Sequence, residues 1–182
     1  MTTSSKIFGV LALILITACN TVNDEEPLTA PDGNGDGEFQ TVTAAGISLE
    51  YLAEDDSLHC LLSATTTGWI SVGLDPKNQM QSANFVIGYV DDGQLHLRDD
   101  WGTSPTQHQS DLSLGGSDDV FGIAGTETDG ITTLEFKIPL DSGDSYDRVL
   151  QIGQSYTVLF AKGNADDFGS YHSSRATALI SL

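Results

Sequence analysis

The sequence predicts an all-β domain built as an antiparallel β-sandwich. Strong helix signals are absent after residue 38, while short runs of β-branched and aromatic residues recur between clusters of Gly, Asp, Asn and Ser. In the run 131–138, Leu134, Phe136 and Ile138 alternate with polar residues. This period of two is typical of a strand with one buried face and one wet face.

Similar runs predict the other strands. Ile70, Val72 and Leu74 share one face of the run 69–74, so we expect this strand also to have one buried and one wet face. The segments Asp91-Asp92-Gly93 and Asp129-Gly130 favour tight hairpin turns, and Pro139 should end the run before it. The expected strands are 40–44, 47–52, 58–65, 69–74, 85–90, 94–98, 120–126, 131–138, 156–161 and 176–182.

The N-terminus, residues 1–18, is typical of a secretory signal. Lys6 precedes an apolar run that is too short to cross a bilayer, which needs about 20 apolar residues. The run ends in Ile16-Thr17-Ala18-Cys19, which resembles a bacterial lipobox. That resemblance implies cleavage before Cys19, lipidation of this cysteine and anchoring to a membrane of the bacterial cell envelope. In the alternative, a plain signal peptide, Cys19 is incidental.

Residues 19–38 comprise the lipid-bearing cysteine and an acidic flexible tether that has few apolar residues to bury. The tether contains Asp32-Gly33-Asn34-Gly35-Asp36-Gly37, which copies the first half of a calcium loop. Its twelfth position is Thr43 rather than a bidentate Glu, so the sequence favours a linker over a metal site here. Residues 39–182 are then enough for one domain.

Charge and cysteine content narrow the function. The chain has 26 acidic residues against 7 Lys and Arg, with a net charge of −19, which argues against nucleic-acid binding. This charge favours docking to a basic partner, although adaptation to salt or colloidal stability explains it equally well. Apart from Cys19 the chain has one cysteine, Cys60, expected to be buried, and it lacks the Cys-x-x-Cys-His motif of covalent haem attachment.

Two residues suggest a cofactor. Met80 and His172 each lie in a loop just before an expected strand, where side chains from separate loops can converge on one pocket. A thioether and an imidazole are an axial pair for haem iron. Taken singly, Met80 could equally fill the core and His172 could be a solvated loop residue.

Four elements occur in an order that resembles the haem-binding branch of the DOMON superfamily, represented by the cytochrome domain of cellobiose dehydrogenase. They are Gly68-Trp69 before a strand, the hairpin pattern from Met80 to Gly88, Asp99-Asp100-Trp101, and His172-x-x-Arg175. The resemblance implies an immunoglobulin-like β-sandwich that holds non-covalent haem b between Met80 and His172. Many relatives have Gly after the final Arg, where this chain has Ala176.

Five further residues are candidates to contact the haem. Arg175 could pair with a haem propionate, or with a surface carboxylate instead. Trp69, Phe85, Tyr89 and Tyr171 could pack against the porphyrin, although aromatic residues in strands more often belong to the core.

The remaining histidines, His59, His96 and His108, show no zinc spacing; His59 and His96 fall in expected strands and His108 in a polar loop. Cys60 lacks the nearby His and Met of a copper site, and no catalytic motif occurs. The resemblance, with Met80 and His172 filling both axial positions of the haem, therefore implies an electron carrier for an unknown redox partner protein, and not itself an enzyme.

The alternative is a carbohydrate-binding module without haem. In that module Trp101, Tyr89 or Trp69 would stack on a sugar ring, and Asp99 and Asp100 would accept hydrogen bonds from its hydroxyl groups.

Overall fold

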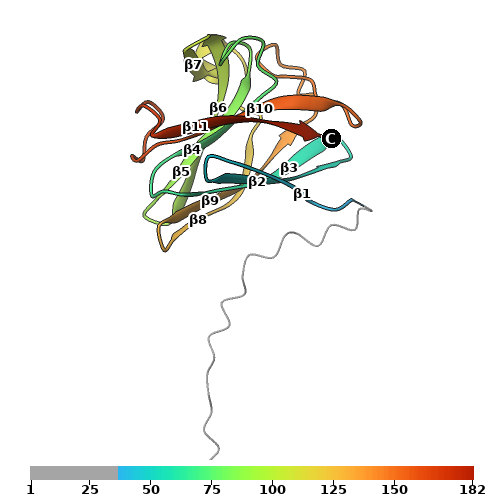
Figure 1. Cartoon of the computed structure of the whole chain (residues 1–182). Coiled ribbons are helices and arrows are strands. Elements are labelled where there is room, and N and C mark those ends of the chain that lie inside the picture. The colour runs from blue at the N-terminus through green and yellow to red at the C-terminus, as the bar shows by residue number, and fades with distance from the viewer. Residues whose placement is uncertain (1–36) are drawn as a thin grey trace, which may run out of the picture. The chain divides into compact units, whose positions relative to one another are not determined.

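The structure, a computed structural model, describes residues 37–182. The expected signal, the lipidation site Cys19 and almost all of the tether lie outside the described residues. Figure 1 shows that the described part is built from β-strands, with one short helix, α1 (Asp111–Leu114). This agrees with the predicted all-β fold class.

The strands form two antiparallel sheets. The five-stranded sheet has the order β1-β2-β3-β9-β8, and its strands are β1 (Gln40–Ala44), β2 (Ile47–Glu54), β3 (Ser57–Thr65), β9 (Ile131–Pro139) and β8 (Phe121–Thr128). The six-stranded sheet has the order β11-β10-β4-β5-β6-β7, and its strands are β11 (Ser174–Ser181), β10 (Ser155–Lys162), β4 (Ile70–Leu74), β5 (Asn84–Asp91), β6 (Gln94–Ser104) and β7 (Gln107–Ser110).

An apolar core joins the two sheets. In β9, Leu134, Phe136 and Ile138 are buried and alternate with partly exposed residues, so this strand has the predicted buried and wet faces. Its partner β3 alternates in the same way and contributes Leu58 and Leu62. The core is completed by side chains from the six-stranded sheet, among them Ile70, Val72, Leu74, Val86, Val158, Phe160 and Ile180.

The prediction of a wet face for the run 69–74 is wrong. Ile70, Val72 and Leu74 do point into the core, but every residue of β4 is buried, and so are Trp69 before it and most of β5. The outer face of these two central strands is shielded from water by loops and neighbouring side chains. Central strands buried on both faces read as continuous apolar runs, and β5 does so.

The predicted hairpin turns are confirmed. Asp92 and Gly93 between β5 and β6 have φ of 49° and 74°, and Asp129 and Gly130 between β8 and β9 have 54° and 74°. Two successive positive φ angles define the type I′ turn, which matches the twist of the strands it joins. Strand β9 ends at Pro139, one residue beyond the predicted end.

The edge of the six-stranded sheet at β6 and β7 was only partly predicted. Strand β6 continues to Ser104, well beyond the expected run 94–98, and pairs with β7, which was not expected. His108 therefore lies in a strand rather than in a polar loop, while His59 and His96 lie in strands as predicted. Helix α1 follows β7 directly and was not expected either.

Within residues 37–182, the structure contains no helix with the length and apolar character needed to span a bilayer.

Cys60 provides a test of the core. The side chain is 3% exposed, and burial strongly raises the pKa of its thiol, so the nucleophilic thiolate should be scarce. In a Cys19→Ser chain we expect no reaction with a thiol reagent such as dithionitrobenzoate at pH 8 until urea unfolds the protein, when one thiol per chain reacts. Rapid reaction of the native protein would contradict this packing.

Candidate functional site

A pocket of about 720 Å³ lies on the outer face of the six-stranded sheet. Small-molecule sites commonly have volumes of about 300 to 1,000 Å³. The walls come from strands β4, β5, β7, β10 and β11 and from three loops. The lining residues are Trp69, Ser71, Gln79, Met80, Phe85, Ile87, Pro105, Thr106, His108, Leu159, Phe160, Ala161, Phe168, Gly169, Ser170, Tyr171, His172, Arg175, Ala176 and Thr177.

The floor of the pocket follows from the period of two in the strands. Ser71 pairs with Ile87 across β4 and β5 and with Ala161 across β4 and β10, so these side chains share one face of the sheet. Their sequence neighbours Ile70 and Val72 point the other way, into the core. The same strands therefore build the core with one face and a largely apolar pocket floor with the other.

Gly73 makes room for one wall of the pocket. It pairs with Phe85, and a Cβ atom on Gly73 would lie 2.3 Å from the Phe85 ring. The absence of a side chain lets this ring lie flat against the sheet, where it is 7% exposed and 5.6 Å from the His108 ring. Phe85 thus gives the pocket a rigid aromatic wall.

Met80 lies in the segment of residues 75–83, which we call the methionine turn. Hydrogen bonds fix this turn against β6. The Gly102 carbonyl accepts a hydrogen bond from Ser82 N at 2.7 Å, and Gly102 N donates to the Ala83 carbonyl at 2.9 Å. A Cβ atom on Gly102 would lie only 1.7 Å from the Met80 carbonyl oxygen. Gly102 is therefore what allows the methionine turn to approach the sheet.

His172 lies in the loop of residues 163–173, which we call the histidine loop. Trp69 holds this loop by three hydrogen bonds: its backbone N donates to the Ala165 carbonyl at 3.0 Å, its carbonyl accepts from Gly163 N at 2.8 Å, and its ring Nε1 donates to Ser170 Oγ at 3.0 Å. Ser173 N donates to the Lys162 carbonyl at 2.8 Å and so joins the loop end to β10. The loop is attached at both ends and in the middle.

The His172 ring contacts two neighbours within the same segment. Arg175 Nη1 lies 3.4 Å from His172 Nε2, and the Tyr171 ring centroid lies 4.1 Å from that of His172. Because a guanidinium group only donates hydrogen bonds, the contact uses the lone pair on Nε2. Nε2 thus lies on the side of the ring that faces the pocket-lining Arg175.

The structure brings six of the seven predicted haem-site residues to this pocket. Met80, His172, Arg175, Tyr171, Trp69 and Phe85 all line it. Tyr89 is not among the lining residues, because its ring stacks on His96 at 4.8 Å and packs on Phe168 at 4.9 Å. Tyr89 thus supports the histidine loop through its contact with Phe168.

The residues present fit a haem. The pocket offers a thioether from Met80 and an imidazole from His172, which suit iron as an axial pair. Phe85, Ile87 and Leu159 supply an apolar surface for a macrocycle, and Arg175 supplies a cation for its carboxylates.

Sequence reasoning missed His108, which lines the same pocket. Its Nδ1 pairs with Asp100, a fully buried carboxylate that also accepts two hydrogen bonds from Arg98. The Arg98 guanidinium in turn lies 4.6 Å from the centroid of the Phe168 ring in the histidine loop. His108 was missed because β7 was not predicted. His108 pairs with Gly102, which belongs to the unpredicted extension of β6.

The residues named for the sugar-binding alternative are mostly buried. Trp69 is 5% exposed, Asp99 and Asp100 are buried, and Asp100 is already paired. Trp101 is partly buried and meets the Tyr146 ring edge-on at 6.4 Å. These side chains therefore do not form an exposed platform for a sugar ring.

Comparisons with known proteins agree with this architecture. A family model described as "DOMON domain" matches residues 43–163. Among solved structures, the fold is similar to the cytochrome b domain of pyranose dehydrogenase from Coprinopsis cinerea, with a TM-score of 0.55 and 17% identity over 74% of this chain and 75% of that one. It is also similar to the cytochrome domain of cellobiose dehydrogenase from Myriococcum thermophilum, with a TM-score of 0.57 and 6% identity over 80% and 82% of the two chains.

The contact between Gly102 and the methionine turn can be tested. In Gly102→Ala the new methyl group would overlap the Met80 carbonyl oxygen, so the turn must move, and we expect a loss of about 1–3 kcal/mol in the free energy of unfolding. Gly169→Ala, in the histidine loop, is the control, since its Cβ would meet nothing within 4 Å. Urea denaturation of both variants measures the difference, and equal stabilities would refute the close approach.

Proposed function

We propose that this chain, which belongs to the DOMON family, binds haem b non-covalently and carries single electrons. One observation supports the proposal above the others: Met80 and His172, 92 positions apart in sequence, line the same pocket. The fold likeness to two cytochrome domains is consistent with it.

In the proposed site, Met80 Sδ and His172 Nε2 are the axial ligands. Haem iron supplies one-electron chemistry when bound, and a methionine ligand raises its potential. Because both axial positions are taken by protein side chains, no position is left for a substrate. We therefore propose a carrier that is not itself an enzyme.

Arg175 has two roles in this proposal. Its guanidinium lies 3.4 Å from His172 Nε2, the atom that would bind iron, so Arg175 would have to leave this nitrogen in the haem-bound protein. A carboxylate is a stronger partner for a guanidinium than an imidazole is, so a haem propionate would take its place as the partner of Arg175. The cost of leaving Nε2 is thereby offset within the same pocket.

The apolar floor would control the potential. Phe85 and Ile87 are almost fully buried and exclude water from that side of the pocket. Low polarity around a haem disfavours the more highly charged ferric state and adds to the effect of the methionine. Tyr171, which is 81% exposed, marks the open rim where a partner could approach.

We further propose that Cys19 carries the lipid that anchors the protein to a membrane of the bacterial cell envelope, with residues 20–38 as the tether. The lipobox-like sequence before Cys19 supports this. The net charge of −19 favours a redox partner with a basic docking surface.

A carbohydrate-binding role without haem would have to use the pocket differently from the way the sequence predicted. Among the described aromatic side chains at the pocket, Tyr171 is the exposed one, and a single exposed ring gives weak stacking on a sugar. We therefore rank this role second.

The axial ligands can be tested by spectroscopy. We expect the purified chain, expressed with ample haem, to show sharp α and β bands on reduction. Met80→Ala and His172→Ala should each lose the low-spin spectrum, because one axial position would then be open. A colourless wild-type protein would refute the proposal.

His108→Ala is the matched control, because it removes the second imidazole of the pocket. His108 is held by the buried Asp100, so we expect this variant to keep a low-spin reduced spectrum. Loss of the bands in His108→Ala together with their retention in Met80→Ala would assign the axial pair to His108 and His172 instead.

Lipidation can be tested separately. Metabolic labelling with a fatty acid in a bacterial host should label the wild-type chain, and the labelled protein should sediment with membranes. Cys19→Ser should abolish the label and release the protein, since Cys19 is the proposed acceptor. Cys60→Ser is the control and should change neither result, because Cys60 is buried in the core.

A further inference from the structure

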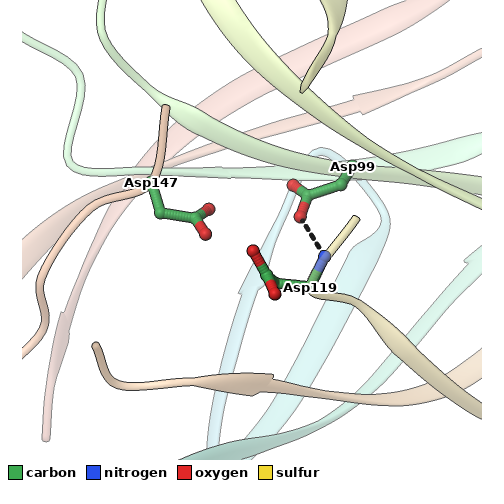
Figure 2. A group of neighbouring side chains, drawn as sticks. All are labelled: Asp99, Asp119 and Asp147. Carbon is green, nitrogen blue, oxygen red and sulfur yellow. Dashed lines mark hydrogen bonds between the residues drawn. The ribbon is translucent and has the colours of Figure 1, made fainter. Parts of the chain in front are cut away.

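A second cluster of polar side chains lies away from the haem pocket. One oxygen from each of Asp99, Asp119 and Asp147 lies within 4.8 Å of the others. Figure 2 shows the three carboxylates pointing toward one another, and the dashed line marks the hydrogen bond of 3.0 Å from Asp119 N to Asp99 Oδ2. Like charges repel, so something must compensate for this convergence.

The described protein supplies no cation for this role. Its Arg–carboxylate ion pairs join Arg98 to Asp100 and Arg148 to Asp75, and neither includes Asp99, Asp119 or Asp147. Hydrogen bonds satisfy only part of the cluster. Asp147 accepts from Asn84 Nδ2 at 2.5 Å and from the Ser142 hydroxyl group.

Buried oxygens without a partner provide an independent indication of a ligand. Asp99, a member of the cluster, is 2% exposed, and its Oδ1 forms no hydrogen bond. Asn84 is 5% exposed and holds Asp147 with its amide nitrogen, while its Oδ1 is also unpartnered. Buried polar atoms are nearly always hydrogen-bonded or bound to an ion, so these oxygens call for a partner.

Asp111 extends the cluster. It is fully buried, and neither of its carboxylate oxygens has a partner. Burial, and then the charges of Asp147 and Asp144, raise its pKa, so Asp111 lies close enough to sense the charge of the cluster. Two unpartnered oxygens on one buried carboxylate are a further indication that a partner is missing here.

We propose that Asp99, Asp119 and Asp147 bind one Ca²⁺ ion, with the unpartnered oxygens of Asn84 and Asp111 as candidate further ligands. Every candidate donor is an oxygen, which suits a hard cation and argues against zinc or copper. Ca²⁺ accepts six to eight oxygens in irregular arrangements, whereas Mg²⁺ requires nearly ideal octahedral geometry and keeps several waters. A cluster of carboxylates from separate segments therefore favours Ca²⁺.

The proposed ion would join three segments that are distant in sequence. Asp99 lies in β6, Asp119 lies between α1 and β8, and Asp147 lies between β9 and β10. Neither connecting segment belongs to a sheet, so a shared ion would fix both of them to the sandwich. A ligand that binds only the folded state raises its stability.

The experiment needs no haem, so its result is independent of the proposed electron transfer. The full chain, treated with a chelator and dialysed, is titrated with CaCl₂ in a calorimeter and then with MgCl₂. We expect saturable binding of one Ca²⁺ per chain, at least about tenfold weaker binding of Mg²⁺, and a higher melting temperature in Ca²⁺ than in chelator.

Asp119→Asn and Asp147→Asn should each weaken Ca²⁺ binding by about tenfold or more, because each keeps the side-chain shape and removes one negative charge. Asp129→Asn, in the exposed turn between β8 and β9, is the matched control and should bind as the wild type does. Circular dichroism checks that the variants are folded, and the wild-type titration decides the proposal even if a variant unfolds. No saturable Ca²⁺ binding, tighter binding of Mg²⁺, or unchanged binding in both variants would overturn it.

Discussion

The organising constraint of this structure is that the central strands β4 and β5 of the six-stranded sheet are buried on both faces. One face packs on the five-stranded sheet and supplies Val72, Val86 and Phe160 to the core. The other face carries Ser71, Phe85 and Ile87 and is covered by the methionine turn and the histidine loop. Since side chains alternate along a strand, every central position serves either the core or the pocket.

Two glycines allow the loops to pack closely against the outer face of the sheet. Gly102 admits the methionine turn to β6, and Gly163 admits the Trp69 ring, whose Nε1 would otherwise lie 2.1 Å from a Cβ atom. That ring then holds Ser170 two residues before His172. The position of each proposed axial ligand thus depends on a glycine and on hydrogen bonds from the sheet, and neither ligand needs support from the other.

The sequence predicts those features that a local period or a turn motif encodes. Alternation in β9 and the Asp-Gly turns predicted strands and hairpins, whereas the pairing of Met80 with His172 rested on the family resemblance. The extension of β6 was not predictable from local signals, because Asp99 and Asp100 disfavour a strand until their partners are known. His108 and the cluster around Asp99 depend on that extension, and so they were missed.

The two consecutive aspartates of β6 show how tertiary context assigns chemistry. Asp100 points to the outer face, where it is fully buried and pairs with Arg98 and His108. Asp99 points to the opposite face, where it meets Asp147 and Asp119; its pKa is raised to about 8, first by burial and then by the charge of Asp147. Neighbours in sequence thus have opposite electrostatic environments because a strand separates them. A cation at Asp99 and a cofactor beside His108 would both contact β5 and β6, since Asn84 at the cluster is followed by Phe85 in the pocket, so an effect of one site on the other can pass through these two strands.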